Sequence, residues 1–170
     1  MSSPEGSMVT FRRAPAGLRR GPIERFARKL QTEVAKGRAF DCLISGDAEL
    51  RRLNRDFRGN DYTTDVLSFP SITQPQAPGI RPPASGPLLG DIAISLPRAR
   101  AQAREFGHQP EQEIRILMLH GVLHLLGMDH ESDGGRMARA EKRWRARLRL
   151  PQGLIERGLI ERGLIERVRS

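Results

Sequence analysis

The chain has little of what stabilises small exported proteins or lets a protein cross a membrane. Cys42 is its only cysteine, so no intrachain disulfide and no cysteine-based zinc cage can form. Its most apolar stretch, residues 116–128, contains two histidines and is too short to cross a bilayer. The first residues show no apolar signal segment. We therefore expect a cytoplasmic protein with no membrane partner.

Aromatic residues and lysine are also scarce. Aromatics make up 5% of the 170 residues, and the only lysines among the 29 basic residues are Lys29, Lys36 and Lys142. The formal net charge of +9 is therefore carried almost entirely by arginine. An arginine excess can attract a polyanion, coat an anionic membrane or have no partner at all. Because a planar guanidinium donates paired hydrogen bonds to phosphate, a nucleic acid is one candidate partner.

Hydrophobic residues make up 38% of the chain, which is enough for one core. Segments with helical periodicity and segments with the pattern of strands follow one another along the chain. The first helix is predicted to begin at Pro22 and to end before Gly37. The segment 89–95 is predicted to be a strand in which Ile92 and Ile94 alternate with Asp91 and Ala93. Further strands are expected near 9–11, 40–45 and 66–69, and further helices near 47–58, 97–106, 110–126 and 135–149.

Two segments do not fit regular elements. Residues 70–87 contain six prolines, which predicts a surface loop. From residue 153 the pentapeptide Gly-Leu-Ile-Glu-Arg occurs three times. This repeat is too short for a solenoid unit, and its period does not keep one helical face. We expect a single catalytic domain over 1–152 followed by a repeated tail over 153–170.

Three of the four histidines lie within eleven residues. His120 and His124 lie four residues apart in a helix that is apolar on almost all sides, so their rings share one face. Gly127 can adopt a left-handed conformation and return the chain, which would bring His130 toward them. Three neutral imidazoles are the ligand set of a catalytic zinc site with an open fourth position. Two buried imidazoles without partners would cost a few kcal/mol, which favours a metal over satisfied core histidines.

The spacing of the three histidines is also that of metzincin peptidases. However, Gly121 stands where these enzymes carry the glutamate that acts as general base. This difference argues against peptide hydrolysis. The fourth histidine, His108, precedes the helix and is not expected to be a ligand.

Residues 120–130, HGVLHLLGMDH, resemble the signature of the YbeY family of bacterial endoribonucleases. A second block within 53–70 agrees, with Leu-Asn, Phe-Arg-Gly and Thr-Asp-Val-Leu-Ser-Phe-Pro in the family's order. A third block, Leu-Gly-Asp-Ile-Ala-Ile, covers 89–94. Thr63 replaces a proline that is frequent in the family, and the repeated tail is not a family feature.

The resemblance implies a zinc-dependent, single-strand-specific endoribonuclease that acts in ribosomal RNA processing and ribosome quality control. The small-subunit rRNA 3′ end would be its substrate, with ribosome-associated proteins as partners and no DNA. It also implies an α/β (α+β) fold, in which a small mixed β-sheet packs with helices and a metzincin-like zinc helix lies at the centre. One Zn²⁺ would be held by His120, His124 and His130, and the family's functional arginine corresponds to Arg58.

Several roles stay open on the residues alone. Arg58 could hold a phosphate or be a solvated arginine at a helix end. Asp129 could orient His130 or a water during catalysis, or could cap the turn. The arginine-rich helix near 135–149 could bind an RNA backbone or be a solvated face. Two other classes of protein also remain, namely a zinc-dependent hydrolase such as a metzincin-like peptidase and a non-catalytic ribosome-biogenesis factor with structural zinc.

Overall fold

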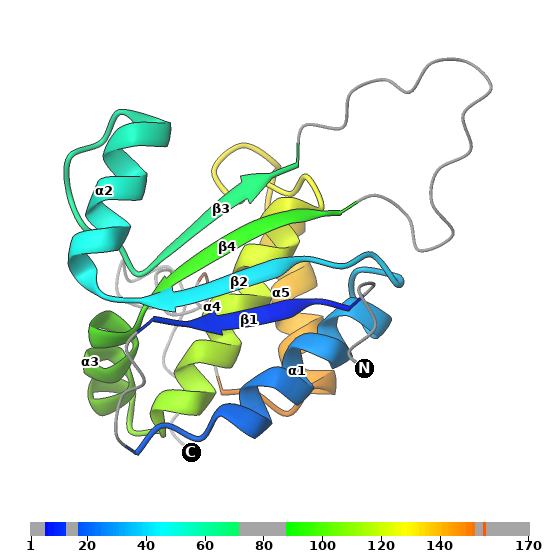
Figure 1. Ribbon diagram of the computed structural model, residues 1–170. Helices are drawn as coiled ribbons and strands as arrows, with labels where there is room; N and C mark the ends of the chain where they lie inside the picture. Colours follow the sequence, from blue (N-terminus) through cyan, green and yellow to red (C-terminus); the bar gives the residue numbers. More distant parts are fainter. Residues whose placement is uncertain (1–5, 13–16, 72–87, 152–154, 156–170) are drawn as a thin grey trace.

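A four-stranded mixed sheet forms the centre of the protein (Figure 1). The computed structural model describes residues 6–12, 17–71, 88–151 and 155. The strands lie in the order β1-β2-β4-β3, with β1 parallel to β2, β2 parallel to β4 and β3 antiparallel to β4. Their bounds are Met8–Phe11 for β1, Asp41–Ser45 for β2, Val66–Pro70 for β3 and Gly90–Ser95 for β4. The expected α+β fold with a small mixed sheet is confirmed.

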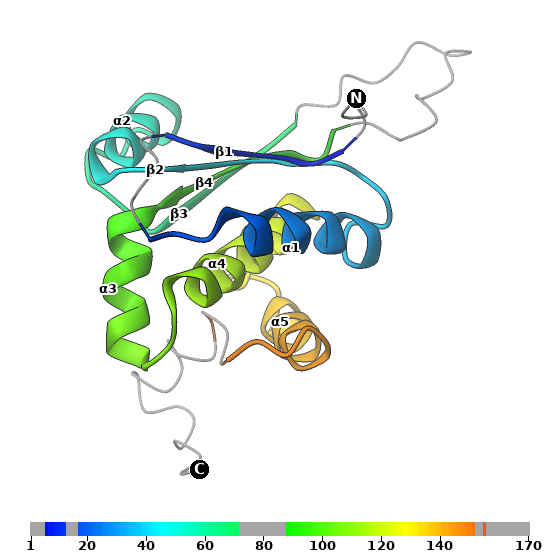
Figure 2. The ribbon, with the colours of Figure 1, turned by 60° about the horizontal axis from the view of Figure 1, so that its bottom comes forward.

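Five helices of the described chain surround this sheet, and Figure 2 shows them on both of its sides. One side carries α4 with α1 beside it and α5 beneath, while α2 lies across the other side. The bounds are Arg20–Glu33 for α1, Asp47–Arg58 for α2, Leu96–Phe106 for α3, Pro110–Leu125 for α4 and Arg136–Arg147 for α5.

The predicted start of the first helix is wrong by two residues. Helix α1 begins at Arg20, and Pro22 is its third residue. A proline is tolerated there because the first N–H groups of a helix have no intrahelical acceptor. Gly37 follows the helix after a short turn and has a φ of +91°.

Helix α4 lies at the centre of the fold, as its composition predicted. Eleven of its 16 residues are buried. At Gly121 the helix approaches β4 so closely that a Cβ atom would lie 2.9–3.1 Å from the side-chain atoms of Ile92. The absence of a side chain at this position therefore sets the distance between the helix and the sheet.

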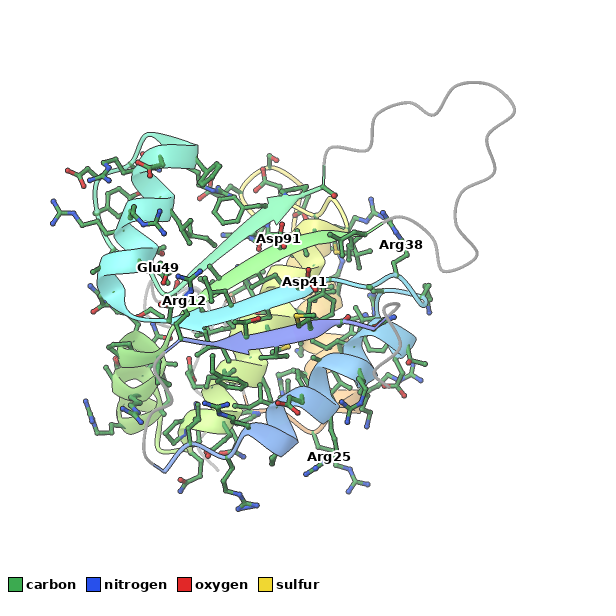
Figure 3. All side chains as sticks on the ribbon, viewed as in Figure 1. Arg12, Arg25, Arg38, Asp41, Glu49 and Asp91 are labelled. Carbon is green, nitrogen blue, oxygen red and sulfur yellow. The ribbon has the colours of Figure 1, made fainter. Side chains whose placement is uncertain are left out.

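The outer face of the sheet is only partly covered. The predicted alternation in β4 is confirmed, because Ile92 and Ile94 lie in the main core while Ala93 lies in a second cluster. Helix α2 forms this second cluster by packing Leu50 against Leu67 and Ala93, so it covers part of the second face of the sheet. Asp91 remains exposed beside Asp41 of β2 (Figure 3), next to a cavity of about 420 Å³.

Burial, and then the charge of Asp41, raises the pKa of the Cys42 thiol to about 12. This shift removes the thiol as a nucleophile.

Within the described ranges, every helix is too short or too polar to span a bilayer. The proline-rich loop lies largely outside the described residues, as does the tail apart from Ile155. The division at residue 152 therefore stays a prediction.

Candidate metal centre

The three clustered histidines meet at the end of α4. His120 and His124 project from the last two turns of the helix, and Gly127, with a φ of +90°, returns the chain toward them. His130 completes a nearly equilateral triangle, with ring centroids 4.7, 5.3 and 5.4 Å apart. One ring nitrogen from each histidine lies within 4.8 Å of the others, so the three could hold a metal ion. The convergence expected from the spacing is confirmed.

Hydrogen bonds fix which nitrogens of two rings are available as ligands. His120 Nδ1 lies 2.8 Å from a carboxylate oxygen of Glu141, and His124 Nδ1 lies 3.0 Å from the backbone carbonyl of Met128. Because a carboxylate and a carbonyl only accept hydrogen bonds, both Nδ1 atoms carry the proton. A neutral ring with this tautomer presents the Nε2 lone pair, which is the form that binds a metal.

The two Nε2 atoms lie 3.1 Å apart. Two lone pairs at this distance repel, because no proton lies between them in the neutral rings. A cation placed between them would turn the repulsion into attraction. Two ligands of a tetrahedral ion with bonds of about 2.0–2.1 Å are about 3.3 Å apart, close to the spacing observed.

His130 offers a second sign of a missing partner. Its Nδ1 atom is buried and has no hydrogen-bond partner among the described residues. An unpaired buried polar atom costs about 1–3 kcal/mol. Three imidazoles suit zinc, copper, iron or nickel better than magnesium or calcium, which prefer oxygen ligands. The residues present therefore fit a transition-metal ion.

The environment keeps His124 uncharged. Burial, followed by the neighbouring His120 and His130 rings, lowers the pKa of this half-buried imidazole to about 4. A neutral imidazole is the ligand form, so His124 is ready to bind a metal at neutral pH.

Glu141 was missed by the sequence analysis. It is the single acid of α5 and is buried, with one oxygen accepting from His120 and the other accepting from the backbone N–H of Ile155 at 2.8 Å. A signal was present, because Glu141 lies at helical spacing among the inward-facing Met137 and Ala140. An acid within an apolar helix face indicates a buried partner.

The end of α2 brings Arg58 to the same place. Its Nη2 donates a hydrogen bond to the backbone carbonyl of Ser68 at 2.5 Å. The Ser68 hydroxyl in turn donates to the backbone carbonyl of Gly121 at 3.2 Å. These bonds connect Arg58, through β3, with the helix that carries the histidines. A pocket of about 190 Å³ is lined by Arg58, His120 and His124 together with residues of β3.

Asp129 lies in the turn between His124 and His130. Its carboxylate accepts hydrogen bonds from the N–H of Glu131 at 3.1 Å and from the hydroxyl of Ser132 at 2.9 Å. The pKa of Asp129 is lowered, first by the bond from Glu131 and then by that from Ser132, with smaller contributions from the two histidines. These bonds cap the turn, while a catalytic role for Asp129 stays a prediction.

His108 lies outside the metal cluster, as expected. Its ring pairs with the fully buried carboxylate of Glu113 at the start of α4. An acid in the first turn of a helix complements the helix dipole. For Glu113 the packing of α4 adds a buried histidine partner.

The pKa of His124 makes the stability of the metal-free protein depend on pH. The pKa is about 4 in the folded state and 6.5 in the unfolded state, so the folded state binds fewer protons. The free energy of unfolding should be highest above pH 6.5 and should decrease as the pH falls toward 4, by about 1 kcal/mol for this partly exposed group. Urea unfolding of the metal-free protein and of its His124→Gln variant measures this free energy at each pH. Its decrease on acidification should be smaller in the variant. Equal decreases would contradict this assignment.

Comparisons with known proteins show the family of this chain. The family model described as Endoribonuclease YbeY matches residues 20–149. A relative from Solibacter usitatus with that name is 73% identical over 157 residues, which cover 92% of this chain and 98% of the relative. Another, from Koribacter versatilis, is 41% identical over 150 residues, covering 88% and 91%. A solution structure of a Thermotoga maritima protein is similar with a TM-score of 0.53 and 25% identity, covering 84% of this chain and 91% of that protein. The chain belongs to the Endoribonuclease YbeY family.

Proposed function

We propose that this member of an endoribonuclease family uses one zinc ion to cleave single-stranded RNA. Its substrate is ribosomal RNA, at the 3′ end of the small-subunit RNA, and it acts in the cytoplasm in ribosome maturation and quality control. Ribosome-associated proteins would be its further partners. The observation that carries this proposal is the pocket that Arg58 shares with two histidines whose ligand nitrogens face each other.

His120, His124 and His130 would hold the zinc ion. Three histidines leave a fourth position for water, which is the arrangement of catalytic rather than structural zinc sites. When bound, Zn²⁺ supplies a Lewis acid and lowers the pKa of a coordinated water from 15.7 to about 7. Glu141 and the carbonyl of Met128 orient two of the rings by accepting their Nδ1 protons.

Arg58 would bind the scissile phosphate. A guanidinium has five N–H donors, and the bond to Ser68 uses one of them. The remaining donors can bind phosphate oxygens and stabilise the charge that accumulates on them during cleavage. Because its pKa is lowered, Asp129 stays ionised beside His124 and His130 and would help to orient the attacking group.

The alternative of a metzincin-like peptidase is disfavoured by packing. A Cβ atom at Gly121 would already lie 2.9 Å from Ile92 Cδ1, so a glutamate at the position of the peptidase base would require Ile92 or the helix to move. The alternative of a non-catalytic protein with structural zinc is disfavoured by the pocket, which extends from two of the histidines to a cationic side chain.

A cleavage assay tests the metal dependence of the proposed reaction. Protein purified without a histidine tag should cut a single-stranded fragment that contains the 3′ end of small-subunit rRNA. A chelator should abolish cleavage and stoichiometric zinc should restore it, since the ion activates the attacking group. His124→Ala, purified in parallel, should be inactive and reveals any contaminating nuclease. Cleavage that survives both the chelator and the substitution would overturn the proposal, and hydrolysis of peptides instead of RNA would favour the peptidase.

Substitution of Arg58 separates phosphate binding from metal binding. Arg58→Gln should lower kcat by roughly 100-fold, because a donor to the transition-state charge is lost. Its zinc content, measured by elemental analysis, should be unchanged. The matched control is Arg55→Gln. Arg55 is an exposed arginine that lies one helical turn before Arg58 and pairs with Asp56. If Arg58→Gln cleaves RNA as fast as this control, the assigned role of Arg58 is wrong.

Substitution of Glu141 tests the support of the metal ligand. Glu141→Gln should weaken zinc binding by roughly 10–100-fold, because a neutral amide orients and polarises His120 less than a carboxylate does. Competition with a chromogenic chelator measures this affinity. Glu105→Gln, at an exposed position of α3, provides the control. Equal zinc affinities of the two variants would exclude Glu141 as a positioning residue.

A further inference from the structure

Helix α5 carries a row of arginines that the metal centre does not use. Arg136, Arg139, Arg143 and Arg147 follow one another at intervals of three, four and four residues. At 100° per residue they lie within an arc of about 80°, along about 16 Å of the helix. All four are exposed. We call this row the arginine stripe.

We propose that the arginine stripe is a second RNA-binding surface, separate from the metal centre, which holds the sugar-phosphate backbone of a long substrate. The inference rests on the proposed function in that it takes RNA as the substrate. It adds a place where RNA is held without being cut.

No acidic side chain of the described residues is paired with the stripe. None of its four arginines forms an ion pair with a described residue. The single acid of the helix, Glu141, is 1% exposed and bonds to His120 in the interior. Like charges at a spacing of four residues destabilise a helix by about 0.2–0.5 kcal/mol per pair. In the free protein the stripe therefore opposes the stability of α5, and a bound polyanion would remove this repulsion.

The basic surface continues beyond α5. Arg147 lies 5.2 Å from the centre of the Trp144 ring, and Lys36, which follows α1, lies 5.8 Å from the same ring. The two cations therefore meet at one aromatic side chain. Their positions extend the positive surface from the stripe to the neighbouring helix.

The stripe faces away from the metal centre. Glu141 lies two residues from both Arg139 and Arg143, which places its side chain about 160–200° around the helix from theirs. Because Glu141 points to His120, the stripe points in the opposite direction. Figure 2 shows α5 on the side of α4 remote from the sheet. A short RNA in the pocket of Arg58 would not reach the stripe, whereas a long one could occupy both.

The chemistry of the surface favours RNA over an anionic membrane. Guanidinium groups bind phosphate through paired hydrogen bonds, and a row of them suits the regular phosphates of a nucleic acid backbone. A helix that binds a bilayer needs an exposed apolar face. In α5 the apolar residues Met137 and Ala140 are buried against the core, so no such face is left.

Binding measurements with zinc-loaded protein test the proposal. The probe is a fluorescent, single-stranded 2′-O-methyl RNA of roughly 40 nucleotides, whose integrity is checked on a gel afterwards. The variant Arg139→Gln/Arg143→Gln/Arg147→Gln should bind it roughly ten-fold more weakly at about 100 mM salt. The slope of log affinity against log salt should decrease by about 2, since each lost phosphate contact in single-stranded RNA contributes about 0.7.

A matched variant controls for the loss of net charge. Arg51→Gln/Arg52→Gln/Arg55→Gln removes three arginines of α2 that lie 2.8, 3.4 and 3.1 Å from carboxylates. It should keep most of the affinity and of the salt slope. Equal losses in the two triple variants would overturn the proposal, and so would unchanged binding by the stripe variant. If the stripe variant does not fold, as judged by circular dichroism, Arg143→Gln alone should still decrease the slope by about 0.7.

Two further arms identify the ligand and separate this proposal from the proposed function. A stripe variant that loses binding to phosphatidylserine vesicles but keeps RNA binding would overturn the assignment to RNA. Binding of the 2′-O-methyl probe does not require cleavage, so it is independent of the chelator assay. If the protein shows no chelator-sensitive cleavage but binds the probe through the stripe, the proposed nuclease function is refuted. The proposal of a second RNA-binding surface then still stands.

Discussion

The contact on which the site depends is the close approach of the Nε2 atoms of His120 and His124 on one face of α4. His120 and His124 cannot relieve the repulsion of their Nε2 lone pairs by donating to each other, because Glu141 and the Met128 carbonyl hold both protons on the opposite nitrogens. A cation is the group that satisfies both nitrogens, and the return of the chain at Gly127 adds a third ligand for it.

Close packing of α4 on β4 decides which chemistry accompanies this metal site. Gly121 lets the helix approach Ile92, and its carbonyl accepts a hydrogen bond from Ser68 of the adjacent strand. The same strand holds Arg58 through the Ser68 carbonyl. The fold thus leaves little room for a side chain next to the first histidine, and it holds a guanidinium nearby, a group that suits a phosphate better than a peptide.

The parts of the site that could be predicted are those set by local geometry. The spacing of the histidines and the glycine that follows them lie within eleven residues, so helical periodicity sufficed. Glu141 lies 21 residues from His120, and Ser68 lies 53 residues from Gly121, so both contacts depend on how elements pack. The burial of Ala93 depends on packing in the same way, because α2 covers the face of the sheet on which Ala93 lies. Motif resemblance supplied Arg58, which periodicity alone left undecided.

Helix α5 shows how one element can serve two purposes without conflict. Its inward face packs Met137 and Ala140 into the core and directs Glu141 to His120. Burial of these side chains contributes enough stability to offset the repulsion within the arginine stripe, which amounts to a few tenths of a kcal/mol per pair, roughly. The outward face can therefore carry a charge pattern that would weaken an isolated helix. The arginines of the stripe lie on the far side of α5 from His120. Their replacement in a relative would therefore leave the three histidines undisturbed.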